Sequence, residues 1–288
     1  MGQYNFDQIL DRTHTKSLKY DFAVKRGKPA DVLPFWVADM DFEIPPELKQ
    51  ILLDRVNHGV FGYTESDDEY FDVLQNWFST RFNWIPEQKW LVKTPGIVFA
   101  LAMAVRAFTK EGEGVLINQP VYYPFSMVID DNNRHLINVP LIKGEERYTI
   151  DFEGIERAIV EENVTLFLLC NPHNPVGRVW TEDELKRLGD ICIKHNVLIV
   201  SDEIHADFVW KGHTHKVFAA LGESYAEHCI VCTAPSKTFN IAGLQVSNIF
   251  IPNDSLRRRF IKEIDRAGYS QLNTMGIVGC EGAYKVGA

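Results

Sequence analysis

The stretch that decides the fold is Cys229-Ile-Val-Cys-Thr233, followed by Ala234-Pro-Ser-Lys237-Thr-Phe-Asn-Ile-Ala-Gly-Leu244. The first part is a short apolar run stopped by a proline, which predicts a buried strand. Lys237 follows among small and apolar residues, where an amine loses its charge readily and can form a Schiff base with a carbonyl. On this stretch alone, a partly buried structural lysine is the favoured interpretation, because perturbed lysines are not always catalytic.

A regular alternation of apolar runs and amphipathic segments surrounds this stretch. Apolar strands that alternate with helices indicate a largely parallel sheet between helices, that is, an α/β fold. One of the helices carries a capping box, in which Thr181 is paired with Glu184. The expected strands are 115–118, 136–139, 165–170, 197–201, 229–233 and 247–251, and the expected helices are 47–57, 70–82, 98–108, 125–131, 151–161, 181–195 and a last one from about residue 254.

Composition and charge exclude several classes of protein. The chain has 288 residues, of which 45% are hydrophobic, and a formal net charge of −9 without long charged runs. This balance argues against binding to nucleic acid or to an anionic membrane. The sequence has no targeting signal and no apolar run of membrane-spanning length, so we expect a soluble, cytoplasmic protein.

Cysteine and histidine patterns give no metal site. The five cysteines are too scattered for a disulfide framework. Cys229 and Cys232 are three residues apart in a strand, which places them on opposite faces. His213 and His215 lie in a polar loop without a third ligand nearby, and we expect both to be solvated.

Polar residues follow three of the predicted strands. The loop Asn171-Pro-His-Asn174-Pro-Val-Gly177 follows one, Asp202 ends the next, and Lys237 follows the third. Ligand sites in open parallel sheets form beyond the carboxyl ends of the strands. We expect the two amides of the loop to project there, beside a carboxylate and a lysine, in a cofactor pocket.

These motifs, in this order, resemble the fold-type I enzymes that use pyridoxal 5′-phosphate (PLP), the aspartate aminotransferase superfamily or class I/II aminotransferases. Within it, four segments are similar to the C–S β-lyase branch, the cystathionine β-lyases of the MalY and PatB type. These are Trp36-Val-Ala-Asp-Met-Asp-Phe42, Phe61-Gly-Tyr63, Asp202-Glu-Ile-His-Ala-Asp207 and Pro235-Ser-Lys-Thr-Phe-Asn240.

The resemblance implies a role for each matching residue. Lys237 would carry PLP and later move the Cα proton, and Asp202 would keep the pyridine nitrogen protonated. Asn174 and His205 would contact the phenolic oxygen of PLP, and Tyr122 would stack on the ring. The phosphate would be bound by the helix start Gly96, Ile97 and Val98, by Ser236, and by Tyr63 from across a homodimer interface.

Several of these residues keep a plainer alternative. Tyr122 is also compatible with a core aromatic, and Gly96 with an ordinary helix start. Asn171 and Asn174 could act only as turn formers. His205 could be a helix histidine whose hydrogen bonds are satisfied.

Two departures from the family pattern bear on function. Gln245 stands where many transaminases carry an arginine for the phosphate, which favours the lyase branch. The resemblance also divides the chain into an N-terminal arm and small-domain segment, residues 1–45, and a PLP-binding large domain, residues 46–288. It implies that the C-terminal part of the small domain is absent, and we expect activity to be impaired in a truncated chain.

The resemblance implies a lyase of sulfur amino-acid metabolism. Such an enzyme cleaves L-cystathionine or a related cysteine S-conjugate to a thiol, pyruvate and ammonia. The alternative is a PLP-dependent aminotransferase on the same scaffold. The alternative of another class is a non-catalytic regulatory or partner-binding protein.

Overall fold

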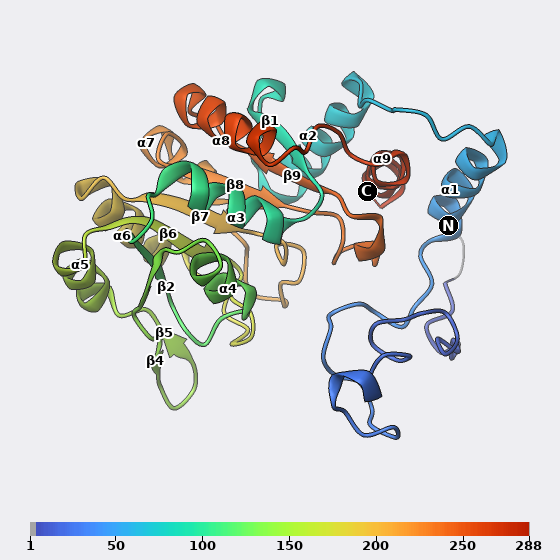
Figure 1. Ribbon diagram of the computed structural model, residues 1–288, viewed down its shortest axis with the longest axis horizontal. Coiled ribbons are helices and arrows are strands. Elements are labelled where there is room, and N and C mark those ends of the chain that lie inside the picture. The colour runs from blue at the N-terminus through green and yellow to red at the C-terminus, as the bar shows by residue number, and fades with distance from the viewer. Residues whose placement is uncertain (1–3, 288) are drawn as a thin grey trace.

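A seven-stranded sheet forms the centre of the computed structural model, which describes residues 4–287 (Figure 1). The strand order is β1-β9-β8-β7-β6-β2-β3, and β9 runs antiparallel to both of its neighbours while the other pairs are parallel. The expected mainly parallel sheet is confirmed. The strands are β1 Leu91–Thr94, β2 Gly114–Ile117, β3 His135–Asn138, β6 Val164–Cys170, β7 Leu198–Asp202, β8 Cys229–Thr233 and β9 Ser247–Phe250, and a separate hairpin has β4 Ile142–Lys143 and β5 Tyr148–Thr149.

The predicted helices are present, with bounds shifted by one or two residues at most of their ends. The capping box of Thr181 and Glu184 is formed at the start of α6. The sequence patterns did not predict α7, α9, β1 or the β4–β5 hairpin. The helices are α1 Pro46–His58, α2 Asp68–Phe82, α3 Ile97–Phe108, α4 Pro124–Asp130, α5 Phe152–Glu161, α6 Glu182–Lys194, α7 Glu223–Ala226, α8 Asp254–Arg266 and α9 Thr274–Val286.

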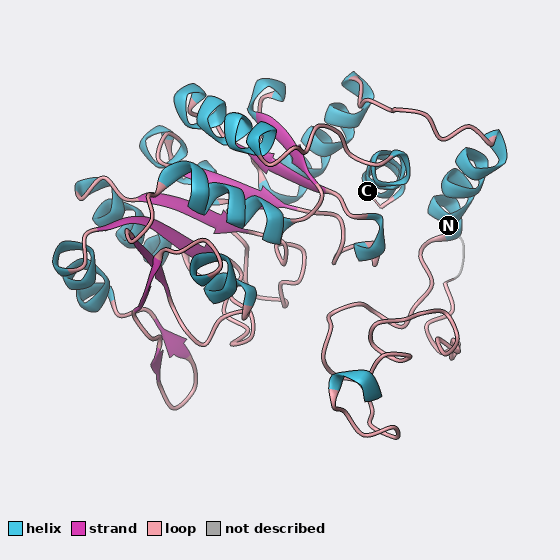
Figure 2. Cartoon of the chain, viewed as in Figure 1, coloured by secondary structure: helices cyan, strands magenta, loops and turns pink. Residues whose placement is uncertain are grey.

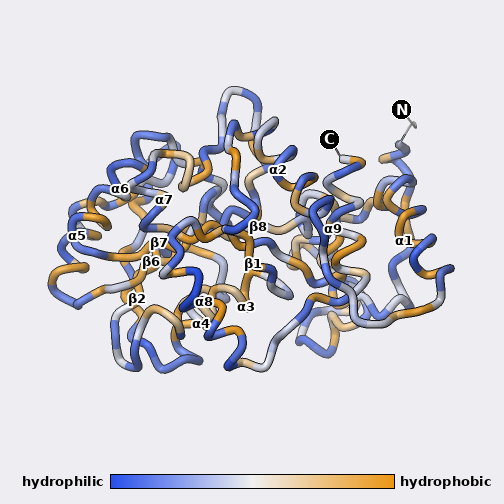
Figure 3. The backbone as a smooth tube through the Cα atoms, turned by 90° about the horizontal axis from the view of Figure 1, so that it is seen from above, coloured by the Kyte–Doolittle hydropathy of each residue, from blue (hydrophilic) through white to orange (hydrophobic). Residues whose placement is uncertain are grey.

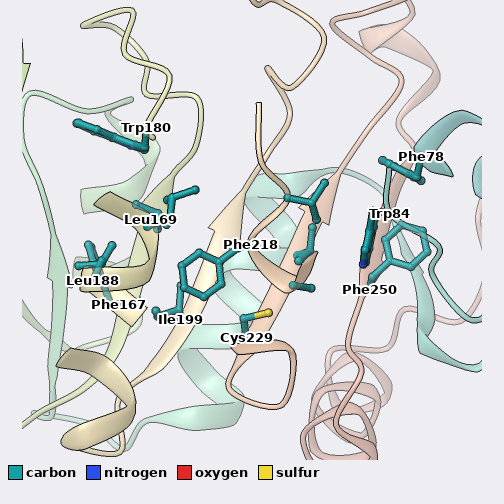
Figure 4. Packing of buried hydrophobic residues seen from close by; sticks show 14 of the residues in the cluster. Phe78, Trp84, Phe167, Leu169, Trp180, Leu188, Ile199, Phe218, Cys229 and Phe250 are labelled. Atoms are coloured by element: carbon teal, nitrogen blue, oxygen red, sulfur yellow. The ribbon is translucent and has the colours of Figure 1, made fainter. Parts of the chain in front are cut away.

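Helices cover both faces of the sheet and bury two hydrophobic clusters. One cluster packs α2, α5, α6 and α9 on the sheet, and the other packs α3, α4 and α8 on the opposite face. All five residues of β8 are buried, as expected for a strand covered on both sides. Cys229 belongs to the first cluster and Cys232 to the second, so their placement on opposite faces is confirmed. Figure 4 shows Cys229 with Phe218, Phe250 and other members of the first cluster.

The N-terminal arm lies apart from these layers. Its described part, residues 4–45, consists of loops and one short helix, Val24–Arg26 (Figure 2). Hydrophobic colour follows the central strands in Figure 3, whereas much of the outer loops is hydrophilic. In the arm, however, Leu33 and Phe35 leave 76% and 94% of their surface exposed. The apolar segment around Trp36 is therefore only partly packed against the rest of the described chain.

Candidate active site

Three strand ends meet at one edge of the sheet, as the sequence predicted. Cys170 at the end of β6 is paired with Asp202 at the end of β7, and Asp202 is paired in turn with Cys232 of β8. The backbone N–H of Asn171 donates to the carbonyl oxygen of Asp202 at 2.9 Å. Lys237 follows β8 in a turn, which we call the lysine loop, residues 234–241. The edge thus carries the loop 171–177, Asp202 and Lys237 side by side.

Asp202 is a buried carboxyl group with a raised pKa. Burial is the main cause that raises its pKa to about 7, and the neighbouring charge of Glu203 adds to the effect, whereas the backbone N–H of Ile204 and the Lys237 ammonium oppose it. Among the described residues, the N–H of Ile204 is the one recorded hydrogen-bond donor to this carboxylate, at 3.1 Å. Asp202 can therefore still accept a hydrogen bond from a cationic ligand nitrogen, which would repay part of the cost of its burial.

Lys237 lies half-buried beside the N-terminal arm. Burial lowers the pKa of its amine, while Asp39 and Asp202 act in the opposite direction. Its Nζ donates to the carbonyl oxygen of Ala38 at 3.4 Å. The lowered pKa increases the share of neutral amine, which is the form that can attack a carbonyl.

A cavity of about 540 Å³ opens onto Lys237. The lysine loop and the turn after β7 supply Lys237, His205 and Phe208 to its wall. The arm supplies the remaining lining residues, among them Tyr20, Phe35, Ala38, Asp39 and Met40. A larger hollow, of about 980 Å³, lies between Trp84, Gly222 and Arg258 and includes none of the predicted site residues. The smaller cavity is thus the one associated with the predicted chemistry.

His205 lines this cavity from a turn, not from a helix, so the alternative of a helix histidine is wrong. Burial lowers the pKa of His205 to about 4, and the Lys237 charge contributes. Its ring is therefore neutral near pH 7, with one nitrogen able to donate and the other able to accept.

Asn174 and Tyr122 are joined directly. The backbone N–H of Tyr122 donates to the carbonyl oxygen of Asn174 at 3.0 Å. Tyr122 leaves 39% of its surface exposed, so it is not a core aromatic. Burial and then the charges of Tyr123 and Asp202 raise the pKa of Tyr122. Asn171, by contrast, is fully buried and donates to the carbonyl oxygen of Lys216 at 3.1 Å, so the expectation that both amides project is wrong for Asn171.

The predicted phosphate residues are placed at different distances from this edge. Gly96 precedes the first turn of α3, which begins at Ile97 and Val98. Because β1 has the same direction as β8, this helix start lies at the same edge of the sheet as Lys237. Ser236 precedes Lys237 in the lysine loop. Tyr63 is 99% exposed in the connection between α1 and α2 and does not line the Lys237 cavity.

Several residues close to the site were not assigned to it from the sequence. Glu203 and His215 form a buried pair with 2.9 Å between Oε2 and Nε2, so the expectation of a solvated His215 is wrong. Thr238, next to Lys237, donates to Asp207 at 2.7 Å. Asp39 approaches Lys237 from the arm. The one sequence signal that could have pointed to Glu203 was its position directly after Asp202.

Residues 4–287 contain neither a metal-type cluster of side chains nor a membrane-spanning helix. No cluster of three or more His, Cys, Asp or Glu side chains has an arrangement suited to a metal ion. None of the helices in this part of the chain is both long and apolar enough to cross a membrane.

The residues at this edge fit PLP. A carboxylate with unused acceptor capacity, a lysine with a lowered pKa and a helix start meet the needs of its ring nitrogen, aldehyde and phosphate. Each group lies at the carboxyl end of the strands, where such ligands bind in open α/β sheets.

Comparison with known proteins agrees with this site. The chain is 43% identical over 283 residues to cystathionine beta-lyase PatB of Bacillus subtilis (strain 168). The alignment covers 98% of this chain and 73% of that protein. The crystal structure of cystalysin from Treponema denticola, which contains pyridoxal 5′-phosphate, superposes on this chain with a TM-score of 0.94 at 41% identity. The superposition covers 99% of this chain and 73% of the cystalysin chain. A PLP-bound putative aminotransferase from Clostridium difficile 630 superposes with a TM-score of 0.96 at 42% identity, with the same coverage. The family model for aminotransferase class I and II matches residues 30–278, and the chain therefore belongs to this family.

Proposed function

We propose that this chain is a PLP-dependent C–S β-lyase that cleaves L-cystathionine or a related cysteine S-conjugate. The observation that carries the proposal is the placement of Lys237, shortly after the end of β8, beside Asp202 at the end of the paired strand β7. The names of the similar proteins favour the same chemistry, since PatB is a cystathionine beta-lyase. The products would be a thiol, pyruvate and ammonia.

Each site residue has a proposed part in binding PLP. Lys237 would hold it through Nζ, and Asp202 would accept the proton-bearing ring nitrogen. Asn174 and the neutral His205 would contact the phenolic oxygen, with Tyr122 against the ring face. The first N–H groups of α3, at Gly96, Ile97 and Val98, together with Ser236 and Tyr63 of a second copy, would bind the phosphate.

The chemistry divides between the cofactor and the chain. PLP supplies an electron sink for the pair left at the substrate Cα. Lys237 Nζ would hold the cofactor and would also take the Cα proton of the substrate, a task for which its lowered pKa is suited. Asp202 would face the ring nitrogen as a carboxylate and would help that nitrogen to keep its proton. Val37, Ala38 and Phe35 of the arm line one side of the cavity.

We infer further that the protein is cytoplasmic and acts as a homodimer on a small amino-acid substrate. The arm, residues 1–45, would close the site as part of the small domain, and residues 46–288 would form the PLP-binding domain. The exposed Tyr63 supports the dimer, because its side chain has no role inside its own chain's cavity.

Product analysis tests the reaction type. The purified protein, supplied with PLP and L-cystathionine, should release pyruvate and thiol in equal amounts without an added keto acid. Amine transfer that depends on an added keto acid, without pyruvate release, would instead support the aminotransferase alternative.

A further inference from the structure

Glu203 is a second buried carboxylate directly behind Asp202. It leaves 2% of its surface exposed. Its Oε1 accepts the Ser201 hydroxyl at 2.8 Å and the Phe218 backbone N–H at 2.9 Å. Its Oε2 lies 2.9 Å from Nε2 of His215. The Ser201 hydroxyl, the Phe218 N–H and the His215 ring nitrogen thus hold the carboxyl group from β7 and from the segment 215–218, and each of its two oxygens has acceptor capacity for such contacts.

Glu203 and Asp202 approach the sheet edge from opposite faces. Neighbouring side chains of a strand alternate between its faces. Ile199 packs in the cluster that contains Phe218, on the side of Glu203, and Val200 packs in the cluster on the side of Asp202. Glu203 therefore lies on the core side of the edge and is not among the residues that line the Lys237 cavity.

We propose that Glu203 is a positioning residue that fixes the end of β7 through Ser201, His215 and Phe218 and keeps a second negative charge behind Asp202. The proposal rests on the proposed function, because Asp202 matters only as the partner of the PLP ring nitrogen. The charge makes Asp202 a stronger hydrogen-bond acceptor and so helps the ring nitrogen to keep its proton.

The surroundings leave this charge weakly screened. Cysteines are neutral when buried, and burial is the first cause of the raised pKa of each cysteine beside the two carboxylates. The charge of Glu203 contributes to the raised pKa of Asp202 as well. The titratable groups that act on the two carboxylates are His215, Cys229 and Cys232 around Glu203, and Cys170, Tyr122 and Lys237 around Asp202.

The variant Glu203→Gln separates the charge from the shape. A glutamine still accepts hydrogen bonds from Ser201 and Phe218 but carries no charge. In the PLP-loaded protein, the visible absorbance reports the proton shared between Lys237 and the cofactor. We expect the pH at the midpoint of this absorbance change to fall by about one unit in Glu203→Gln. A shift of this size is the effect of removing one charge at short range in a partly buried site.

Glu263→Gln is the matched control. Glu263 is a buried carboxylate of α8 that is paired with Arg106 at 2.6 Å and Arg266 at 3.2 Å, away from the site. Its replacement should alter thermal stability without moving the midpoint. An unmoved midpoint in folded, PLP-loaded Glu203→Gln would overturn the proposal and leave the proposed function intact. The lack of a PLP band in the unmutated protein would overturn both.

His215 variants decide the matter if Glu203→Gln does not fold. His215→Gln keeps a polar partner for Glu203, whereas His215→Leu removes this contact and leaves the Glu203 carboxyl group less firmly positioned. We expect His215→Leu to lower the absorbance midpoint and His215→Gln to restore it. Equal midpoints in the two variants would contradict the positioning role.

Discussion

Asn240 and Met40, 200 residues apart, are joined by both ends of one side-chain amide. The Met40 N–H donates to Asn240 Oδ1 at 2.9 Å, and Asn240 Nδ2 donates back to the Met40 carbonyl oxygen at 3.0 Å. Nδ2 also donates to the carbonyl oxygen of Phe42 at 2.9 Å. This amide attaches the arm to the lysine loop and so sets one wall of the Lys237 cavity.

Loss of this amide should release the arm. Asn240 has a φ of 57°, so Asn240→Gly removes the side chain without adding backbone strain. We expect the variant to lose roughly 1–3 kcal/mol of arm attachment. Limited proteolysis should cut residues 1–45 much faster than in the unmutated protein. Asn253→Ala, which removes the N-cap of α8, is the control and should leave arm cleavage unchanged.

Asp202→Asn should stabilise the protein without PLP while slowing its chemistry. The pKa of Asp202 is raised from 3.8 to about 7, so its contribution to stability is present below pH 4 and is lost as the pH rises through 7. At pH 8 the variant should therefore have a larger free energy of unfolding, by as much as about 4 kcal/mol.

The same comparison at pH 4 is the control, because the difference should vanish where Asp202 is protonated. With PLP bound, exchange of the substrate α-proton in deuterated water should be much slower in Asp202→Asn. A variant that exchanges the proton at the unmutated rate would restrict Asp202 to a structural role.

His205 should remain neutral well below the usual range of histidine. Burial and Lys237 lower its pKa to about 4. Its contribution to stability is present above pH 6.5 and is lost as the pH falls through 4. The ring-proton NMR signal of His205, assigned with His205→Asn, should not move between pH 8 and pH 6. A transition centred near the ordinary value of 6.5 would show that the ring is open to solvent.

Co-expression of two impaired variants tests whether Tyr63 serves the site of a second copy in a homodimer. If Tyr63 serves the site of the partner copy, Lys237→Ala and Tyr63→Phe each impair every site of their own homodimers. A mixed dimer should regain one intact site, with Lys237 from one chain and Tyr63 from the other. Co-expression should therefore raise pyruvate release above that of either variant. No gain in an isolated mixed dimer would place Tyr63 outside the site.

The strands and helices were predictable where burial makes a strong pattern. β8 consists mainly of apolar residues because both of its faces are covered. The start of α6 is marked in the sequence by the capping-box residues Thr181 and Glu184. β1 was missed because its four residues include Lys93 and alternate only weakly. α9 was missed because small residues replace the usual large apolar face: a side chain at Gly282 would meet Leu48 and Ile51 of α1 at 3.1–3.2 Å.

The site was predictable where one residue carries the chemistry and its segment ends a strand, as for Lys237 and Asp202. Contacts between distant segments were not. Nothing local to Asp39 or Asn240 shows that the arm meets the lysine loop. His215 looked solvated because its neighbours in the sequence are polar, and its partner Glu203 lies twelve residues away.

The most direct test of the PLP site is chemical trapping at Lys237. The purified protein is incubated with PLP, reduced with borohydride, digested and analysed by mass spectrometry. We expect the reduced cofactor on the peptide that contains Lys237, and no label at this site in Lys237→Ala. Label on a different lysine, or no label at all in the unmutated protein, would contradict the account.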